Sequence, residues 1–151
     1  MDEKKILISA PIGGSKQYSI NQWFDWIANQ DYPNYDICCC ANGDRKIDLA
    51  NKLNQVEIID VHGQKKKIHT LILLNEKDLC KINRITYSRE KIRLYALKNN
   101  YDAIFWLDTD TIPSSKDAIH QLLKWDKDST SGLYFYKGSR VPIIIDKVTQ
   151  I

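Results

Sequence analysis

Short apolar runs alternate with segments of helical periodicity along this chain of 151 residues, and no other feature restricts the fold as strongly. Apolar runs that end in glycine, proline or polar residues predict strands at 5–10, 35–40, 56–61, 68–74, 103–107 and 132–136. Apolar residues at every third or fourth position predict helices at 19–30, 47–53, 85–98 and 118–123. This order favours an α/β fold, a three-layer sandwich around a mostly parallel central sheet.

Individual side chains refine these expectations. Ser19 and Gln22 have the spacing of a capping box, so Ser19 is expected to cap the first helix. Ile47 is expected on the inner face of the second helix. Pro11 is expected to close the first strand, and Trp106 is expected in the core because tryptophans within apolar strands usually pack there.

The charge balance excludes one class of partner. Lysine and arginine exceed aspartate and glutamate by 22 − 19 = +3, and the basic residues are dispersed except at 65–67. We expect that lysine triplet to lie in a solvated loop. Without a dominant basic face the chain is not expected to bind nucleic acid, whereas small anionic ligands remain open.

The four cysteines favour a core strand over a metal or redox site. Cys38, Cys39 and Cys40 are adjacent in an apolar run, Cys80 stands alone, and no C-x-x-C pair exists. Free cysteine behaves as a small buried hydrophobe and is usual in reducing compartments. The apolar stretch before Pro11 is too short for a signal peptide or a membrane span. We therefore expect a cytoplasmic protein with no transmembrane segment.

Two carboxylates follow the most apolar strand. Asp108 and Asp110 are separated by one residue, so in extended geometry they point to the same side. Two carboxylates aimed at one point repel unless a cation lies between them, and their oxygens suit Mg²⁺, Mn²⁺ or Ca²⁺. The plain alternative is that they only end the strand and cap the next turn. An EF-hand is excluded because the required glycine and closing glutamate are missing.

Two arginines precede that strand on one helix. Arg89 and Arg93 are four positions apart, so they share a helix face that either is solvated or contacts an anionic ligand. Glu90 can also pair with Arg93, three positions on, and the spacing alone leaves both alternatives open. The Gly13-Gly14 pair after the first strand matches no nucleotide-binding fingerprint and indicates a flexible connection.

These pieces together resemble the GT-A glycosyltransferases, especially family 2 and related inverting enzymes. The segment Gln-Asp-Tyr-Pro-Asn-Tyr-Asp-Ile at 30–37 is similar to the family's Q-x-Y-P-x-Y-E-I. The segment Tyr-Asp-Ala-Ile-Phe-Trp-Leu-Asp-Thr-Asp at 101–110 is similar to its y-D-x-i-x-x-l-D-x-D strand. Asn42-Gly43-Asp44, Arg89-Glu90 and 131–134 stand where the family has a loop after the second strand, an Arg-Asn pair and a strand beside the acceptor site.

The resemblance implies a metal-dependent hexosyltransferase that uses a UDP- or GDP-sugar. Mn²⁺ or Mg²⁺ on the D-x-D motif would stabilise the leaving diphosphate. The resemblance places the donor site on residues of four segments: Pro11, Asp44, Arg89, Arg93, Asp108 and Asp110. The nucleotide base of the donor would lie near the first loop and Asp44. It makes 1–151 a single GT-A-like domain, with 1–110 binding the nucleotide-sugar and 111–151 beginning the acceptor side.

The catalytic base is unassigned, because family members continue past this point and supply it later. Asp146 is a weak candidate, since it is the one acidic residue after Asp128. The acceptor, whether glycan, lipid or protein, is open, as are the completeness of the acceptor part and assembly into a homo-oligomer. Two alternatives remain: a non-catalytic nucleotide-sugar-binding module and a phosphohydrolase of the haloacid dehalogenase type.

Overall fold

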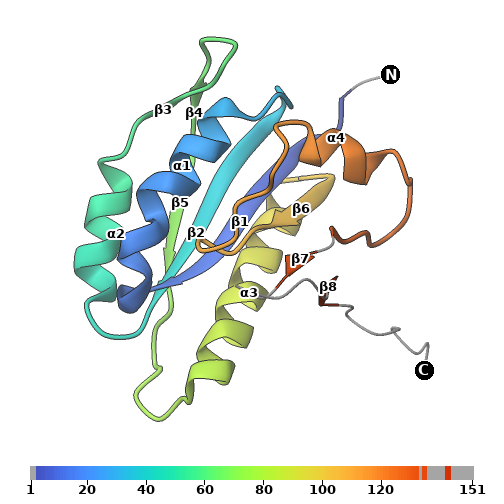
Figure 1. The fold of residues 1–151 in the computed structure, drawn as a ribbon. Helices are drawn as coiled ribbons and strands as arrows, with labels where there is room; N and C mark the ends of the chain where they lie inside the picture. The colour runs from blue at the N-terminus through green and yellow to red at the C-terminus, as the bar shows by residue number, and fades with distance from the viewer. Residues whose placement is uncertain (1–2, 133, 136–141, 144–151) are drawn as a thin grey trace, which may run out of the picture. The chain divides into compact units, whose positions relative to one another are not determined.

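The computed structural model describes residues 3–132, 134–135 and 142–143, and the chain divides into two compact units, 1–118 and 119–151. Figure 1 shows the strands and helices along the chain. The helices are η1 (a 3₁₀ helix, Gly14–Ser19), α1 (Ile20–Asn29), α2 (Lys46–Asn54), α3 (Lys81–Lys98) and α4 (Ala118–Leu123). The strands are β1 (Ile6–Gly13), β2 (Tyr35–Asn42), β3 (Ile58–Ile59), β4 (Lys65–Lys66), β5 (Ile68–Ile72), β6 (Ala103–Trp106), β7 (Tyr134–Phe135) and β8 (Pro142–Ile143).

A four-stranded parallel sheet is the centre of the first unit. Its strand order is β5-β2-β1-β6, and all three strand pairs are parallel. Helices connect these strands, as parallel neighbours require. The predicted α/β class with a parallel central sheet is therefore confirmed.

Helices α1 and α3 cover opposite faces of this sheet. On one face Leu7 and Cys38 pack with Ile92 of α3 in a buried cluster. On the other face the rings of Trp26 in α1 and Phe105 in β6 stack with centroids 6.1 Å apart. Successive side chains of a strand point to opposite faces of the sheet, so each strand contributes apolar residues to both layers.

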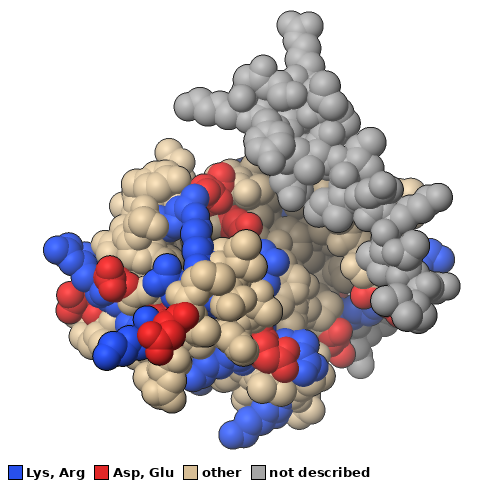
Figure 2. All heavy atoms as spheres, turned by 90° about the horizontal axis from the view of Figure 1, so that it is seen from below, with Lys and Arg blue, Asp and Glu red and all other residues tan. Residues whose placement is uncertain are grey.

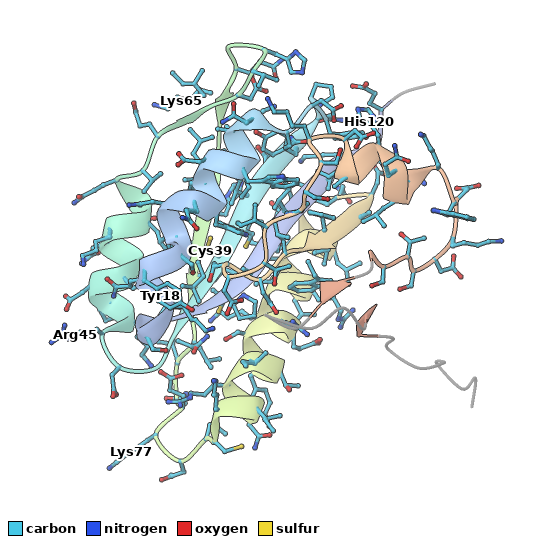
Figure 3. The ribbon with its side chains drawn as sticks, in the orientation of Figure 1. Tyr18, Cys39, Arg45, Lys65, Lys77 and His120 are labelled. Atoms are coloured by element: carbon cyan, nitrogen blue, oxygen red, sulfur yellow. The ribbon has the colours of Figure 1, made fainter. Side chains whose placement is uncertain are left out.

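The cysteine triplet lies in the core, as predicted. Cys38, Cys39 and Cys40 are each fully buried on β2, and Figure 3 shows Cys39 in the middle of the sheet. Burial raises the pKa of the Cys38 thiol to about 12 and that of Cys39 well above its usual value. These thiols are structural apolar groups, whereas Cys80 is exposed at the start of α3.

Three local predictions were wrong. Strand β1 continues through Pro11 to Gly13, because β6 pairs with β1 only as far as Ser9 and proline is tolerated where a strand has one paired side. Ser19 stands at the N-cap position of α1 as predicted, but its side chain makes no capping hydrogen bond: its hydroxyl donates to the carbonyl of Lys16 because η1 leads directly into the helix. Ile47 is 53% exposed, because Leu49 takes the inner position of α2.

The lysine triplet is not a simple solvated loop. Lys65 and Lys66 form β4, which pairs with β3 in an antiparallel hairpin outside the central sheet, so the strand predicted at 56–61 is only two residues long. Lys66 is buried, and its Nζ lies 3.1 Å from Oδ2 of buried Asp60. Asp60 also accepts hydrogen bonds from the backbone N–H groups of His62 and Gln64, which closes the hairpin turn.

The second unit contains a short helix and a two-stranded antiparallel ladder. Ile119 of α4 is buried, and β7 pairs with β8. The predicted strand at 132–136 corresponds to β7, although residues 133 and 136 lie outside the described residues, as does Asp146. None of the helices in the described ranges is long and apolar enough to cross a membrane.

Candidate functional site

A cleft of about 530 Å³ opens at the carboxyl ends of β1, β2 and β6. Figure 2 views this end of the protein and shows a hollow, with basic and acidic side chains interspersed on the surrounding face. The end of β1, the start of η1, the segments that follow β2 and β6, and the first half of α3 line the cleft. The lining residues are Pro11, Gly13, Gly14, Ser15, Lys16, Asn42, Gly43, Asp44, Arg45, Lys81, Arg84, Ile85, Arg89, Asp108, Thr109 and Asp110.

The two D-x-D carboxylates both line this cleft. The backbone turns directly after β6, where the N–H of Thr111 donates to the carbonyl of Asp108 at 2.9 Å. Asp108 and Asp110 are exposed, whereas Thr109 between them is 4% exposed and its hydroxyl forms a hydrogen bond with the Ser19 hydroxyl at 3.3 Å. The alternation expected from extended geometry therefore survives in the turn that follows the strand.

Each of these carboxylates has a basic partner from another loop or helix. A terminal guanidinium nitrogen of Arg89 in α3 lies 3.4 Å from Oδ1 of Asp108. Lys16 of η1 forms an ion pair with Oδ2 of Asp110, and the hydrogen bond to that carboxylate raises the pKa of Lys16. The chain thus neutralises both carboxylates with its own cations.

The start of η1 and the loop after β2 approach each other closely where they line the cleft. A Cβ atom on Gly14 would lie 2.7 Å from the carbonyl oxygen of Asp44, so only glycine fits there. Gly43 and Arg45 both have positive φ, of 74° and 59°, which turns the chain sharply into α2. The left-handed conformation is uncommon for arginine and costs on the order of 1 kcal/mol.

Trp106 is not in the core, contrary to prediction. It is 39% exposed at the end of edge strand β6, and the Arg89 guanidinium carbon lies 5.6 Å from the centroid of its ring. At this distance the ring supports Arg89 through a cation–π contact. The tryptophan therefore positions a cleft residue without itself lining the cleft.

Five of the six predicted donor residues come together in the cleft, and one does not. Pro11, Asp44, Arg89, Asp108 and Asp110 line it. Arg93 is not among the lining residues: its Nε and one terminal nitrogen bind the two carboxylate oxygens of Glu90, each at 2.8 Å. Arg93 is therefore a solvated residue paired with Glu90. Arg89 faces the cleft, where it could contact an anionic ligand.

Four basic residues of the cleft were missed from the sequence: Lys16, Arg45, Lys81 and Arg84. Lys16 stands two positions after the Gly13-Gly14 pair, which is a signal that could have been used. Helix α3 begins at Lys81, four residues before the predicted start, so its first turn was not recognised as part of a helix. Nothing in the sequence indicates that Arg45 adopts a left-handed conformation.

The carboxylates of the cleft match the way proteins hold Mg²⁺ together with a phosphate ligand. No group of three or more His, Cys, Asp or Glu side chains arranged for a metal is found among the described residues. Asp108 and Asp110 nevertheless supply two carboxylates to one cleft that also contains several cations. Mg²⁺ is usually held by one or two carboxylates together with substrate phosphates, and this donor set fits that pattern.

Comparison with protein-family models, with curated proteins and with solved structures found no match to this chain.

Proposed function

We propose that this protein is a GT-A-type glycosyltransferase that moves a sugar from a nucleoside-diphosphate sugar to an acceptor. The observation that supports this most is the convergence of Asp44, Asp108, Asp110 and Arg89 in one cleft, although Asp44 and Asp110 are 66 positions apart in the chain. Pro11 lines the same cleft from β1. Convergence of residues chosen from a family pattern is what a donor site requires.

The topology adds a second argument. From β1 the chain adds β2 and β5 on one side and then crosses to add β6 on the other, so the direction of strand addition reverses between β1 and β6. Ligands of open parallel α/β sheets bind beyond the strand carboxyl ends at such a reversal. Lys16 after β1 and Asp110 after β6 line the cleft at this place.

Asp108 and Asp110 would hold Mn²⁺ or Mg²⁺ together with the donor diphosphate. When bound, such an ion supplies Lewis-acid stabilisation of the charge that develops on the departing nucleoside diphosphate. Arg89 and Lys16, which pair with these carboxylates in the protein alone, are placed to bind phosphate oxygens of the donor. Arginine suits this role because its guanidinium binds two oxygens at once.

The catalytic base is left unassigned, with Asp146 outside the described residues. UDP- and GDP-sugars are both considered as donors, and a glycan, a lipid or a protein as acceptor. All four cysteines are free thiols, which supports a reducing, cytoplasmic setting.

Thermal unfolding with Mn²⁺ and UDP or GDP tests the donor site. A ligand at about 100 times its Kd adds about 2.7 kcal/mol of stability, which raises Tm by roughly 5–10 °C for a chain of this size. The metal-dependent part of the shift should vanish in Asp110→Ala and persist in Asp25→Ala, which removes an exposed carboxylate of α1 outside the cleft. Absence of any shift with UDP, GDP or their sugars would contradict the proposal.

Activity assays separate the proposed function from its alternatives. Hydrolysis or transfer of a sugar from the donor supports the transferase. Binding without turnover supports the non-catalytic module. Release of phosphate from simple phosphomonoesters, with loss of that activity in Asp108→Asn, would favour the phosphohydrolase.

A further inference from the structure

Three basic side chains line the cleft away from the D-x-D carboxylates. These residues, called the basic triad here, are Arg45 at the start of α2 and Lys81 and Arg84 in the first turn of α3. The proposed donor residues do not include them. Their positive charges therefore have no role in the site described so far.

Arg45 and Arg84 of the triad lie at the loop that follows β2, and Lys81 lines the same cleft. The Arg84 guanidinium lies beside Gly43, with NH1 3.8 Å from the position a Cβ would take there. Lys81 and Arg84 are three positions apart on α3 and so share a helix face. Arg45 follows Gly43 by two residues, and Figure 3 shows it at the beginning of α2, at the same end of the protein as Lys77 of the loop before α3.

The triad differs from the other two cations of the cleft in its partners. Lys16 and Arg89 each form an ion pair with a carboxylate. In the described ranges of the chain, no carboxylate oxygen lies within 4.0 Å of a side-chain nitrogen of Arg45, Lys81 or Arg84. Like charges held together repel, so an anion bound among them removes an unfavourable interaction and adds favourable ones.

Arg45 of the triad and the two carboxylates follow different strands. Arg45 follows β2, Asp108 and Asp110 follow β6, and β1 lies between these two strands. Neighbouring strands are about 4.8 Å apart, so the ends of β2 and β6 are separated by about 10 Å. A diphosphate held at Asp108 and Asp110 would therefore lie nearer the β6 side of the cleft, and the triad remains available to a second anionic group.

We propose that Arg45, Lys81 and Arg84 form a phosphate-binding subsite that works without a metal ion. The cleft then takes a phosphate in addition to the diphosphate at Asp108 and Asp110, and only this second statement rests on the proposed function. A phosphate monoester fits the subsite because it carries nearly two charges and three oxygens that accept charge-assisted hydrogen bonds. The phosphate belongs either to the nucleotide itself, on its ribose, or to a separate phosphorylated acceptor.

Calorimetric titration with inorganic pyrophosphate in EDTA tests the subsite independently of any metal. The folded protein should bind pyrophosphate at low ionic strength, and Arg84→Met and Lys81→Met should each weaken binding roughly tenfold. Lys77→Met is the matched control, because it removes one exposed positive charge from the loop before α3 without touching the cleft. Asp110→Asn should retain metal-free binding while it loses the Mn²⁺-dependent response to UDP.

Three results would overturn the subsite, and one would keep it while rejecting the proposed function. Unchanged affinity in both Arg84→Met and Lys81→Met, or no pyrophosphate binding at all in EDTA, would overturn the subsite. An equal loss in Lys77→Met would also overturn it, because the effect would then come from net charge alone. Metal-free binding that depends on Arg84, combined with no response to Mn²⁺ and UDP, would keep the subsite and reject the proposed function.

Two further titrations identify the source of the phosphate. If it belongs to the nucleotide, adenosine 3′,5′-bisphosphate binds more tightly than adenosine 5′-monophosphate, and Arg84→Met removes the difference. If it belongs to an acceptor, glucose 1-phosphate binds in the presence of saturating Mn²⁺ and UDP, and Arg84→Met abolishes that binding. A result in which neither ligand depends on Arg84 contradicts the proposal.

Discussion

The indole Nε1 of Trp23 donates a hydrogen bond to the carbonyl oxygen of Leu107 at 2.9 Å, which ties helix α1 to the residue immediately before Asp108. Trp23 is fully buried, and Leu107 is 4% exposed. The backbone N–H of Leu107 donates to the carbonyl of Ser9 in β1 at 3.0 Å. Both backbone polar groups of Leu107 are therefore hydrogen-bonded, which fixes the point from which the D-x-D turn begins.

Trp23→Phe is expected to destabilise the protein by about 1–3 kcal/mol, because the buried carbonyl of Leu107 loses its indole donor while an aromatic ring is retained. Urea unfolding measures the change. Trp125→Phe provides the control, because Trp125 is 68% exposed and its replacement should alter stability by less than about 0.5 kcal/mol. Equal losses in the two variants would contradict the role of the Trp23–Leu107 bond.

Lys16→Met is expected to strengthen binding of Mn²⁺ alone by roughly fivefold, because Lys16 competes with a metal ion for the carboxylate of Asp110. The same variant should weaken binding of UDP in the absence of metal, since a cation of the cleft is lost. Calorimetric titration measures both affinities. Lys52→Met, which removes an exposed lysine outside the cleft, should change neither of them. Weaker Mn²⁺ binding in Lys16→Met would show that this lysine does not oppose the metal.

Gly14→Ala is expected to cost about 1–3 kcal/mol, because the added Cβ would stand 2.7 Å from a backbone oxygen of Asp44 and the two loops would have to separate. Thermal unfolding measures the loss. In Gly132→Ala the Cβ meets nothing within 4 Å, so the same substitution should be nearly neutral there. Equal Tm values for the Gly14→Ala variant and the wild type would mean that the loops yield without strain.

The buried ion pair of Asp60 and Lys66 predicts a pH dependence of stability. Burial alone would raise the pKa of Asp60, but hydrogen bonds from the backbone of Gln64 and His62 and the charge of Lys66 together lower it below its usual 3.8. A lowered folded-state pKa stabilises the protein above the unfolded-state pKa, and this contribution is lost as the pH falls below about 4 towards the folded-state pKa.

Asp60→Asn should therefore cost about 3 kcal/mol at pH 7, where it leaves Lys66 buried without its carboxylate. The difference from the wild type should shrink as the pH is lowered below about 4, since the wild-type carboxylate is then protonated too. Urea unfolding at several pH values measures this. Glu57→Gln removes an exposed carboxylate beside the same hairpin, and it should change the pH dependence far less because solvent screens its ion pair with Lys65. A constant difference across the pH range would contradict the assigned ion pair.

The fold class and the carboxylate pair could be predicted because both depend on local sequence. Apolar runs of strand length between amphipathic helices lead to a parallel sheet whatever their detailed packing. Asp108 and Asp110 could be placed at its edge because they directly follow a strand, and the period of two keeps them on one side. The burial of Cys38, Cys39 and Cys40 followed from their position in such a run.

Other features depended on contacts between distant segments. Lys66 belongs to a lysine triplet typical of a solvated loop, yet the hairpin buries it against Asp60. Trp106 belongs to an apolar run, yet it lies at an edge strand that leaves its ring partly exposed. Periodicity cannot report such outcomes, because it records the neighbours along the chain and not the segments that pack against them.

The spacing of neighbouring residues is enough to predict the parallel α/β architecture, the buried cysteine strand and the two carboxylates at a strand end. Which cations meet those carboxylates depends on the packing of segments that are distant in the chain. Lys16 is paired with Asp110 across 94 residues, whereas Arg45, Lys81 and Arg84 line the same cleft without a carboxylate partner in the described ranges. The physical reason is that charge pairing depends on distance in space, which is set when β1, β2, β6 and α3 bring their ends to one cleft.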